Sequence, residues 1–295
     1  MNFDHFDQCI VCGSRSLKPL QGYSKDFLHK CSSCSFVFAA RIPSENELIA
    51  HYNTYPRTNS ISTITIQRYN EILDNLEVYR KTNNLIDVGC GDGFFLETAK
   101  KRGWNVFGTE YTDTAVAICR KKGIEMQQGK LNPNQYADGF FDVVASFEVL
   151  EHINNPNEEL GYFSKILRNG GAVYLTTPNF NSLSRYLLGN QWSIIEYPEH
   201  LSYYTRKTLK SLFVKHGFAV YKIDTTGLSL NRILSSIRKK RAEQVNSSVP
   251  PPNHDEAFRA RSERSFWLRW AKNTTNYILT ILGIGDSLKA TFIKK

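Results

Sequence analysis

The sequence predicts an α/β protein in which helices cover both faces of a mostly parallel β-sheet, preceded by a small cysteine-rich ribbon. Short apolar runs alternate with amphipathic stretches between residues 85 and 180, which is the pattern of successive β-α units. The first 40 residues carry two Cys-x-x-Cys pairs instead. A chain of 295 residues is long enough for one such α/β domain and an accessory piece.

The first β-α unit, LIDVGCGDGFF at 85–95, is the most informative stretch. An apolar run ends in Asp87, turns through Gly89, Gly91 and Gly93, and continues into a helix. The three glycines let the backbone turn sharply and lie against a ligand where a Cβ would clash. An acid at the strand end suits a cationic ligand better than a pyrophosphate, and the spacing is Gly-x-Gly-x-Gly.

The same periodicities predict the other elements in order. The next strand finishes in Glu110, 23 residues after Asp87, where a carboxylate commonly holds ribose hydroxyls. Helices are expected over 61–80, 113–123 and 205–217, and further strands over 124–130, 141–147, 170–179, 218–225 and 285–295. A Gly170-Gly171 turn introduces the strand over 170–179.

The cysteines near the N-terminus predict a metal site. Cys9 and Cys12 form one pair and Cys31 and Cys34 a second, with 18 residues between the pairs. This spacing falls in the range of four-cysteine zinc sites, in which a hairpin brings the two pairs together. Because sulfur would fill all four positions, such a zinc ion is structural, and His29 is a bystander.

The glycine-rich stretch and the strand ends that follow it resemble the class I S-adenosylmethionine-dependent methyltransferases. The resemblance implies a Rossmann-like fold with a mostly parallel seven-stranded sheet and an antiparallel last strand. It also implies S-adenosylmethionine as cofactor. The residues carried over are Asp87, Gly89, Gly91 and Gly93 at the methionine and ribose end, Glu110 on the ribose hydroxyls, Tyr111 on the adenine, Gln128 and Gly129 through their backbone, and Ser146 with Phe147 facing the donor.

The chain is predicted to have five parts. They are a zinc ribbon at 1–40, N-terminal helices covering the donor pocket at 41–84, the S-adenosylmethionine-binding core at 85–230, a basic helical insertion at 231–282, and the final strand of the core sheet at 283–295. Ser44 and Glu47 have the spacing of a capping box, which predicts a helix start in the second part. The sequence does not fix the oligomeric state.

The composition places the protein in the cytoplasm. The N-terminus lacks the basic region and apolar core of a secretion signal, and no apolar run approaches the roughly 18 residues of a membrane span. Residues 231–272 hold ten basic and four acidic residues, which supplies +6 of the net charge of +9. Three interpretations of this insertion stay open.

The first interpretation is a solvent-exposed helical segment whose positive charge serves solubility. The second is a patch that attracts a phosphorylated or membrane-borne substrate, with Trp267, Trp270 and Tyr277 on an interfacial helix and the protein peripheral at the inner face of the membrane. The third, nucleic-acid binding, ranks last, because the ribbon has few basic residues and no RNA-binding module is recognisable. No nucleic-acid partner is therefore expected.

Two histidines follow predicted strands at the sheet edge where ligands bind. His200 is the preferred general base, with Tyr197 and Glu199 orienting its ring or holding an acceptor hydroxyl; His152 is the second candidate. Imidazole titrates near neutrality, which suits removal of a proton from a hydroxyl or carbon acceptor. Each histidine also has a plain structural interpretation, packing at a helix start for His152 and anchoring its loop for His200.

A four-cysteine ribbon joined to this core resembles sugar methyltransferases of surface-polysaccharide and deoxysugar pathways. Zinc-containing sugar C-methyltransferases carry a Tyr-x-Glu-His run whose histidine acts as base, and residues 197–200 match it, although those enzymes are typically longer. FDVVASFEVLEH resembles ubiquinone-pathway O-methyltransferases. The predicted function is methyl transfer to a sugar, as a nucleotide-sugar or lipid-linked glycan precursor. The alternatives are an O-methyltransferase of a phenol or quinone-type molecule and a non-catalytic S-adenosylmethionine-binding protein.

Overall fold

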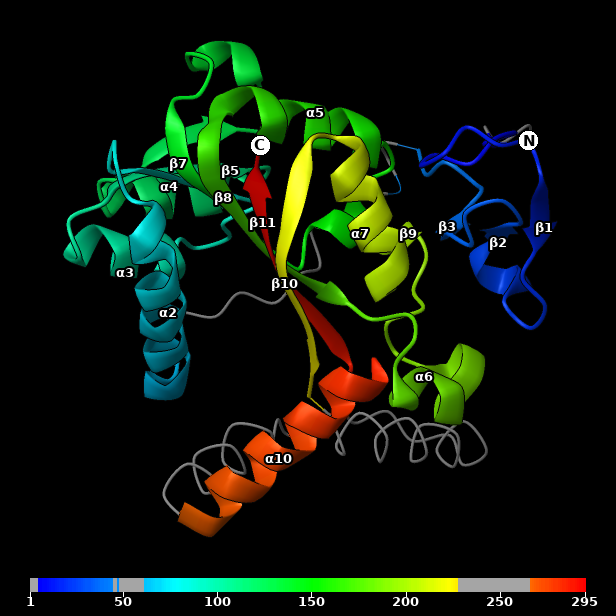
Figure 1. Cartoon of the computed structure of the whole chain (residues 1–295). Helices are drawn as coiled ribbons and strands as arrows, with labels where there is room; N and C mark the ends of the chain where they lie inside the picture. Colours follow the sequence, from blue (N-terminus) through cyan, green and yellow to red (C-terminus); the bar gives the residue numbers. More distant parts are fainter. Residues whose placement is uncertain (1–4, 45–46, 48–60, 228–265) are drawn as a thin grey trace. The chain divides into compact units, whose positions relative to one another are not determined.

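The computed structural model describes residues 5–44, 47, 61–227 and 266–295 (Figure 1). The predicted helix after Ser44 and the insertion up to residue 265 lie outside these residues. Two compact units are described, each assembled from three stretches of chain. The described residues within 1–55, 178–206 and 224–288 form the ribbon unit, and those within 56–177, 207–223 and 289–295 form the sheet unit.

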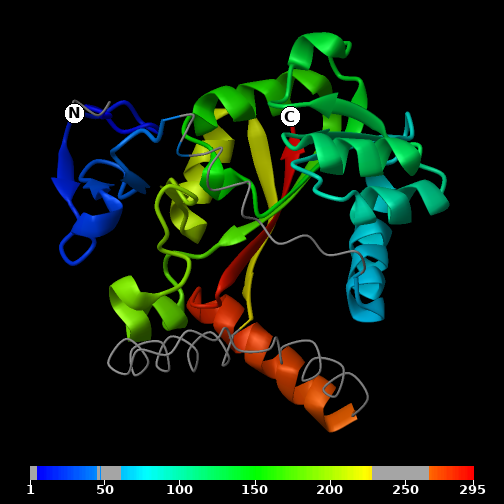
Figure 2. The same ribbon diagram turned by 180° about the vertical axis from the view of Figure 1, so that it is seen from behind.

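Seven strands form the large sheet in the order β10-β11-β8-β7-β4-β5-β6 (Figures 1 and 2). Strands β6, β5, β4, β7 and β8 pair in parallel, and β11, the last strand of the chain, lies between β8 and β10 and runs antiparallel to its neighbours. The predicted mostly parallel sheet with an antiparallel last strand is confirmed. The bounds are β4 Asn84–Val88, β5 Asn105–Glu110, β6 Glu125–Gln128, β7 Phe141–Phe147, β8 Leu167–Pro178, β10 Phe218–Thr226 and β11 Ser287–Lys294.

Helices connect these strands and bury one apolar face each. Their bounds are α2 Thr63–Leu76, α3 Phe94–Lys101, α4 Asp113–Lys121, α5 Pro156–Ile166 and α7 Arg206–Lys215. Ser62 begins α2, because its hydroxyl accepts a hydrogen bond from the Thr65 N–H. The apolar faces of α2, α3 and α4 meet β4, β5, β7 and β8 in one core. No helix among the described residues is both long and apolar enough to cross a membrane.

Strand β8 begins earlier than the sequence predicts. Leu167 pairs with Phe141, and Ala172 pairs with Val143, so the residues between bulge out of the pairing and the glycines lie within the strand. The bulge places the Arg168 guanidinium on the buried carboxylate of Asp142. That ion pair stabilises the bulge, in which the extra residues are not paired with β7.

The ribbon unit contains a second, four-stranded sheet in the order β1-β2-β3-β9. Its bounds are β1 Leu17–Pro19, β2 Leu28–Cys31, β3 Val37–Ala39 and β9 Ser202–Tyr203. Strand β9 comes from the stretch after β8, and Val37 pairs with Tyr203 across the antiparallel ladder. Trp192, Ile194 and Leu201 pack with Leu28 of the ribbon in one core.

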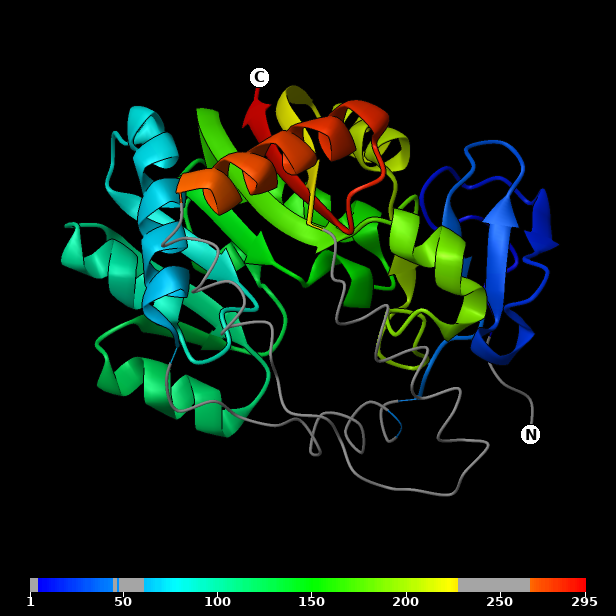
Figure 3. The same ribbon diagram turned by 90° about the horizontal axis from the view of Figure 1, so that it is seen from below.

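Two further helices belong to the ribbon unit, α6 at Leu183–Leu188 and α10 at Phe266–Leu282 (Figure 3). Helix α6 is not among the helices that the sequence predicts, and it begins where the Ser182 hydroxyl accepts a hydrogen bond from the Arg185 N–H. The last turn of α10 is fastened to the end of β10, because the Thr225 hydroxyl donates to the Leu279 carbonyl at 2.7 Å.

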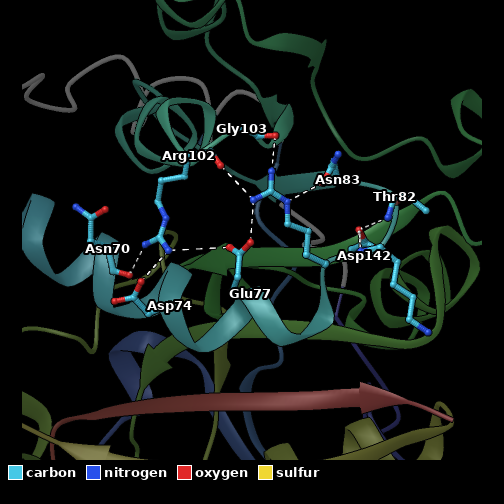
Figure 4. A network of polar contacts seen from close by, with 10 residues as sticks. Asn70, Asp74, Glu77, Thr82, Asn83, Arg102, Gly103 and Asp142 are labelled. Carbon is cyan, nitrogen blue, oxygen red and sulfur yellow. Dashed lines mark hydrogen bonds and ion pairs between the residues drawn. The ribbon is translucent and has the colours of Figure 1, made fainter.

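A polar network fixes the end of α2 to the sheet unit (Figure 4). The Arg102 guanidinium donates to the Asp74 carboxylate at 2.7 Å, and Arg80 donates to the Glu77 carboxylate at 2.8 Å and the Gly103 carbonyl at 2.6 Å. These bonds join the helix to the turn between α3 and β5. Helix α2 is therefore held against the turn that follows the C-terminal end of α3.

Candidate active site and cysteine cluster

The glycine loop that follows β4 leaves open space at one position. Gly91 has φ +54°, and a Cβ built on it would meet no atom within 4 Å. A Cβ on Gly89 would lie 2.5 Å from Val149 Cγ2, and one on Gly93 would lie 2.7 Å from Cys119 Sγ. Gly89 and Gly93 are therefore needed for packing inside the protein, whereas Gly91 is the glycine that leaves room for a ligand.

Glu110 is held at the end of β5 by backbone donors. One of its oxygens accepts the Gly91 N–H at 3.1 Å, and the other accepts the N–H groups of Tyr111 at 2.8 Å and Thr112 at 3.2 Å. These bonds orient the carboxylate across the glycine loop. The first oxygen accepts only the Gly91 bond among those described and keeps a position for a ligand hydroxyl, whereas the second also accepts the Thr112 hydroxyl at 3.4 Å.

Asp87 is a buried carboxyl group with one unsatisfied hydrogen-bond acceptor. It is 2% exposed, and its Oδ1 has no partner in the described part of the chain. Burial raises its pKa well above the ordinary value, and the nearby Cys119 thiol and Glu110 carboxylate raise that pKa further. A cationic or hydrogen-bond-donating ligand would stabilise this oxygen, which fits a donor that carries an ammonium and a sulfonium group.

The residues that follow β5 and β6 form the opposite edge of this loop region. The Tyr111 side chain is 66% exposed, so one face of the ring is available for stacking. Gly129 donates its N–H to the Glu110 carbonyl at 2.8 Å and has φ +86°, with no atom within 4 Å of a built Cβ. The Gln128 side chain is bonded to Asp113. The backbone of Gly129 is therefore not covered by a side chain, as expected if the adenine ring of the donor approaches it closely.

At the end of β7, Ser146 is buried and the Phe147 ring packs among aromatic residues. The centroid of the Phe147 ring lies 4.8 Å from that of Phe95, 5.9 Å from that of Tyr69 and 5.6 Å from that of Tyr174. The Phe147 ring thus belongs to the aromatic wall beside the glycine loop.

Tyr69 of α2 is a residue that the sequence analysis missed. Burial and, to a smaller extent, the negative charge of Asp87 raise the pKa of its hydroxyl to about 12. Its ring packs on Phe95 at 5.4 Å, one residue past the start of α3. Tyr69 shares the apolar face of α2 with Leu73 and Leu76, so helical periodicity alone assigns it to packing.

The two candidate bases belong to different units. His152 ends the short 3₁₀ helix Leu150–His152 of the sheet unit and is half-buried. Its neighbour Glu151 is buried and accepts a hydrogen bond from the Thr177 hydroxyl at 2.9 Å. His200 belongs to the ribbon unit and is 8% exposed.

The ring of His200 is oriented by a backbone carbonyl. Its Nδ1 lies 2.7 Å from the Ile194 carbonyl oxygen, which can only accept, so Nδ1 carries a proton and Nε2 of the neutral ring holds the lone pair. Glu199 is buried beside it. Tyr197 lies against the ribbon, where its ring centroid is 5.0 Å from that of Phe27 and 5.1 Å from the Arg41 guanidinium.

The four N-terminal cysteines meet in one cluster. All four sulfur atoms lie within 4.8 Å of one another, with 3.6 Å between Cys9 and Cys34 and between Cys12 and Cys31. Tetrahedral zinc with bonds of about 2.3 Å separates its sulfur ligands by about 3.8 Å, so the cluster fits that ion. His29 is not in the cluster, and its Nδ1 bonds to the Phe27 carbonyl.

The two cysteine pairs have the same local backbone. Gly13 and Ser35, each one residue after a pair, have φ of 73° and 65°. Each donates its N–H to the carbonyl of the first cysteine of its own pair, at 2.8 Å to Cys9 and 2.9 Å to Cys31. The pKa shifts of the two pairs differ: burial raises the pKa of the Cys9 thiol to about 11, whereas N–H groups of Cys34 and Ser33 outweigh burial at Cys31 and hold its pKa at about 7. The repeated turn therefore supports a metal site by its geometry.

Comparison with known proteins supports the fold and decides the family. Residues 64–223 match the family model described as a methyltransferase domain. The chain belongs to this methyltransferase family. A solved S-adenosylmethionine-dependent methyltransferase from Archaeoglobus fulgidus aligns over 85% of this chain and all of its own, with a TM-score of 0.52 and 18% identity. Its likeness supports the methyltransferase fold.

Curated relatives of this methyltransferase share a common description. The ubiquinone biosynthesis O-methyltransferase of Methylococcus capsulatus is 34% identical over 110 residues, which cover 35% of this chain and 46% of that protein. The protein of the same description from Nitrosomonas europaea is 26% identical over 215 residues, covering 68% of this chain and 86% of its own length. The chain thus spans less than half the length of the first relative and most of the second.

The glycine loop of the methyltransferase core gives a paired prediction. Gly91→Ala should cost only the strain of a side chain at φ +54°, about 1–2 kcal/mol, and should weaken S-adenosylmethionine binding about 10- to 100-fold, because its Cβ would enter the space left for the donor. Gly93→Ala, also at positive φ, should lower the free energy of unfolding by about a further 1–3 kcal/mol through its clash with Cys119. Titration calorimetry with the donor and urea unfolding measure the two effects. Wild-type donor affinity in Gly91→Ala would contradict the assignment.

Proposed function

We propose that the protein transfers the methyl group of S-adenosylmethionine to the hydroxyl of a phenol or quinone-type small molecule. The observation that carries this proposal is the likeness to ubiquinone biosynthesis O-methyltransferases over 215 residues. It favours this alternative over the sugar acceptor that ranks first in the sequence analysis. A phenolic hydroxyl, with a pKa near 10, also needs less help from a base than a sugar hydroxyl.

The residues of the sheet unit are proposed to hold the donor. When bound, S-adenosylmethionine supplies an electrophilic methyl on a sulfonium. Asp87 pairs with the ammonium, Glu110 accepts the ribose hydroxyls, and Tyr111 stacks on the adenine. Gly91 would leave space for the methionine and ribose end of the donor. These roles together align the donor for an in-line displacement.

A single imidazole is proposed to remove the acceptor proton. His200 is the better candidate, because the Ile194 carbonyl fixes the tautomer that leaves Nε2 as acceptor. His152 is the second candidate, at the end of the short 3₁₀ helix that follows β7 in the sheet unit. The buried Glu199 and Tyr197 are proposed to shape the loop around His200.

The proposed base is tested by His200→Gln with purified protein, methyl-labelled S-adenosylmethionine, and panels of catechols, quinols and nucleotide-sugars. We expect label in a phenolic acceptor, a kcat about 10²- to 10⁴-fold lower in the variant, and unchanged donor affinity. His216→Gln, whose ring bonds only to Asn157 at 2.9 Å among its described contacts, is the matched control. Full activity of His200→Gln together with loss of methyl transfer in His152→Gln would show that His152 is the base.

A sugar acceptor remains a second candidate because the cysteine cluster is joined to the methyltransferase core. Label in a nucleotide-sugar and none in the phenols would establish it in place of the first proposal. Donor binding without transfer to either panel would support a non-catalytic binding protein. The cluster itself is proposed to hold one structural zinc ion, supported by its four thiols and repeated turns.

A further inference from the structure

An exposed apolar surface lies on the two helices of the ribbon unit. It consists of six side chains that are each at least half exposed, and we name it the α6–α10 patch: Tyr186, Leu187, Tyr277, Ile278, Ile281 and Leu282. These are six of the twelve large exposed apolar side chains among the described residues. Single exposed apolar residues are ordinary, but a concentration of them marks an interaction site.

The two helices that carry the patch meet at one end of each. The Leu183 N–H at the start of α6 donates to the Ile284 carbonyl at 2.8 Å, just after α10 ends. Asn179 donates to the Gly283 carbonyl at 3.1 Å. The first turn of α6 is therefore beside the last turn of α10, as both views of these helices show (Figures 1 and 3).

One face of α10 is anchored and the other is not. Leu279 is 4% exposed, and Thr280 exchanges hydrogen bonds with the backbone of Thr225. With 3.6 residues per turn, Tyr277, Ile278, Ile281 and Leu282 all lie on the side away from this anchor. The helix thus presents its apolar face outward instead of covering the core.

The sequence around the patch indicates the chemistry of its partner. The 231–272 stretch, which precedes α10 and includes its first residues, has ten basic and four acidic residues. An exposed apolar helix face beside a basic stretch of sequence is typical of a helix that lies in the interface of an anionic bilayer.

We propose that the α6–α10 patch docks the protein on the surface of an anionic lipid bilayer. A second copy of this chain is a poorer occupant, because each chain carries a net charge of +9 and two copies would repel each other. Nucleic acid is poorer still, because it offers no match for six exposed apolar side chains. The inference depends on neither the acceptor nor the base of the methyl transfer.

The experiment compares full-length protein on vesicles of phosphatidylcholine alone and of phosphatidylcholine mixed with phosphatidylglycerol, by co-sedimentation. We expect binding to the anionic vesicles that decreases with salt, and at least about tenfold weaker binding for Ile278→Glu/Ile281→Glu, because both charges enter the apolar face. The matched control is Val78→Glu/Val214→Glu, which adds the same charge at two exposed valines of the sheet unit and should bind as the wild type does.

Unchanged donor affinity and unfolding midpoint in both double variants show that they fold. Equal vesicle binding by the two double variants would overturn the proposal. So would a wild-type dimer, measured by light scattering without lipid, that Ile278→Glu/Ile281→Glu converts to a monomer. Because no readout uses methyl transfer, failure here is separate from failure of the proposed function.

Discussion

Replacing Asp87 with asparagine is expected to weaken donor binding on the order of 100-fold while making the protein more stable. The carboxyl group is 2% exposed and its Oδ1 has no partner among the described residues, so its ionised form is costly without ligand. An amide of the same shape removes that cost but cannot pair with an ammonium. We expect the free energy of unfolding to rise by about 1–3 kcal/mol at neutral pH.

The pH dependence of this effect has a defined sign. The pKa of Asp87 in the folded protein is raised above its unfolded value, so ionisation destabilises the fold at pH above the unfolded pKa. As the pH falls and Asp87 becomes protonated in both states, the stability difference between Asp87→Asn and wild type should disappear. Donor affinity of the wild type should fall over the same range, because a cation binds the ionised carboxylate.

Titration calorimetry in buffers of different ionisation enthalpy checks the same assignment, since donor binding should release a proton from Asp87 in the wild type but not in Asp87→Asn. Asp138→Asn, at a carboxylate that is 79% exposed, is the control and should change neither stability nor affinity. Donor binding of wild-type strength in Asp87→Asn would remove Asp87 from the proposed site.

The second large effect is expected from Cys31→Ser. The wild type should contain one zinc ion per chain by elemental analysis, and the variant none, since three thiolates hold the ion poorly. The ribbon unit should lose several kcal/mol of stability, at least about 3. Because β9 pairs with β3, backbone amides near Ser202 should exchange hydrogen faster as well.

Cys31→Ser should affect methyl transfer and donor binding differently, because the two depend on different units. His200 lies on the stretch that shares the ribbon core, so methyl transfer should fall sharply in Cys31→Ser. Donor binding, which is proposed to use only the sheet unit, should persist. Cys90→Ser, at a thiol outside the cluster, is the matched control and should retain zinc. Full stability without zinc in the wild type would contradict the proposal.

Most of the sheet unit follows from local sequence. Apolar runs ending in Asp87 and Glu110 predict where β4 and β5 stop, and glycine spacing predicts the turn between them, because strand length and turn chemistry are local properties. The reciprocal bonds between Ser44 and Glu47, at 3.0 and 3.3 Å, likewise confirm the predicted capping box.

What the sequence alone misses depends on contacts between distant residues. The Ile194 carbonyl that orients His200 carries no sequence signal, since any residue type supplies a carbonyl. Nor does any local pattern pair Ser202 with Phe38. Nothing in the sequence singles out Tyr69, because the apolar face of a helix looks the same whether it meets core or a ligand.

The pairing of β3 with β9 has a consequence for the order in which the protein is made. Val37 leaves the ribosome roughly 165 residues before Tyr203, a delay of roughly 8 to 33 s at the usual rates of synthesis. During that interval the edge of β3 has no partner strand, although all four cysteines have already emerged. Zinc captured at that stage would hold the nascent hairpin until its last strand arrives.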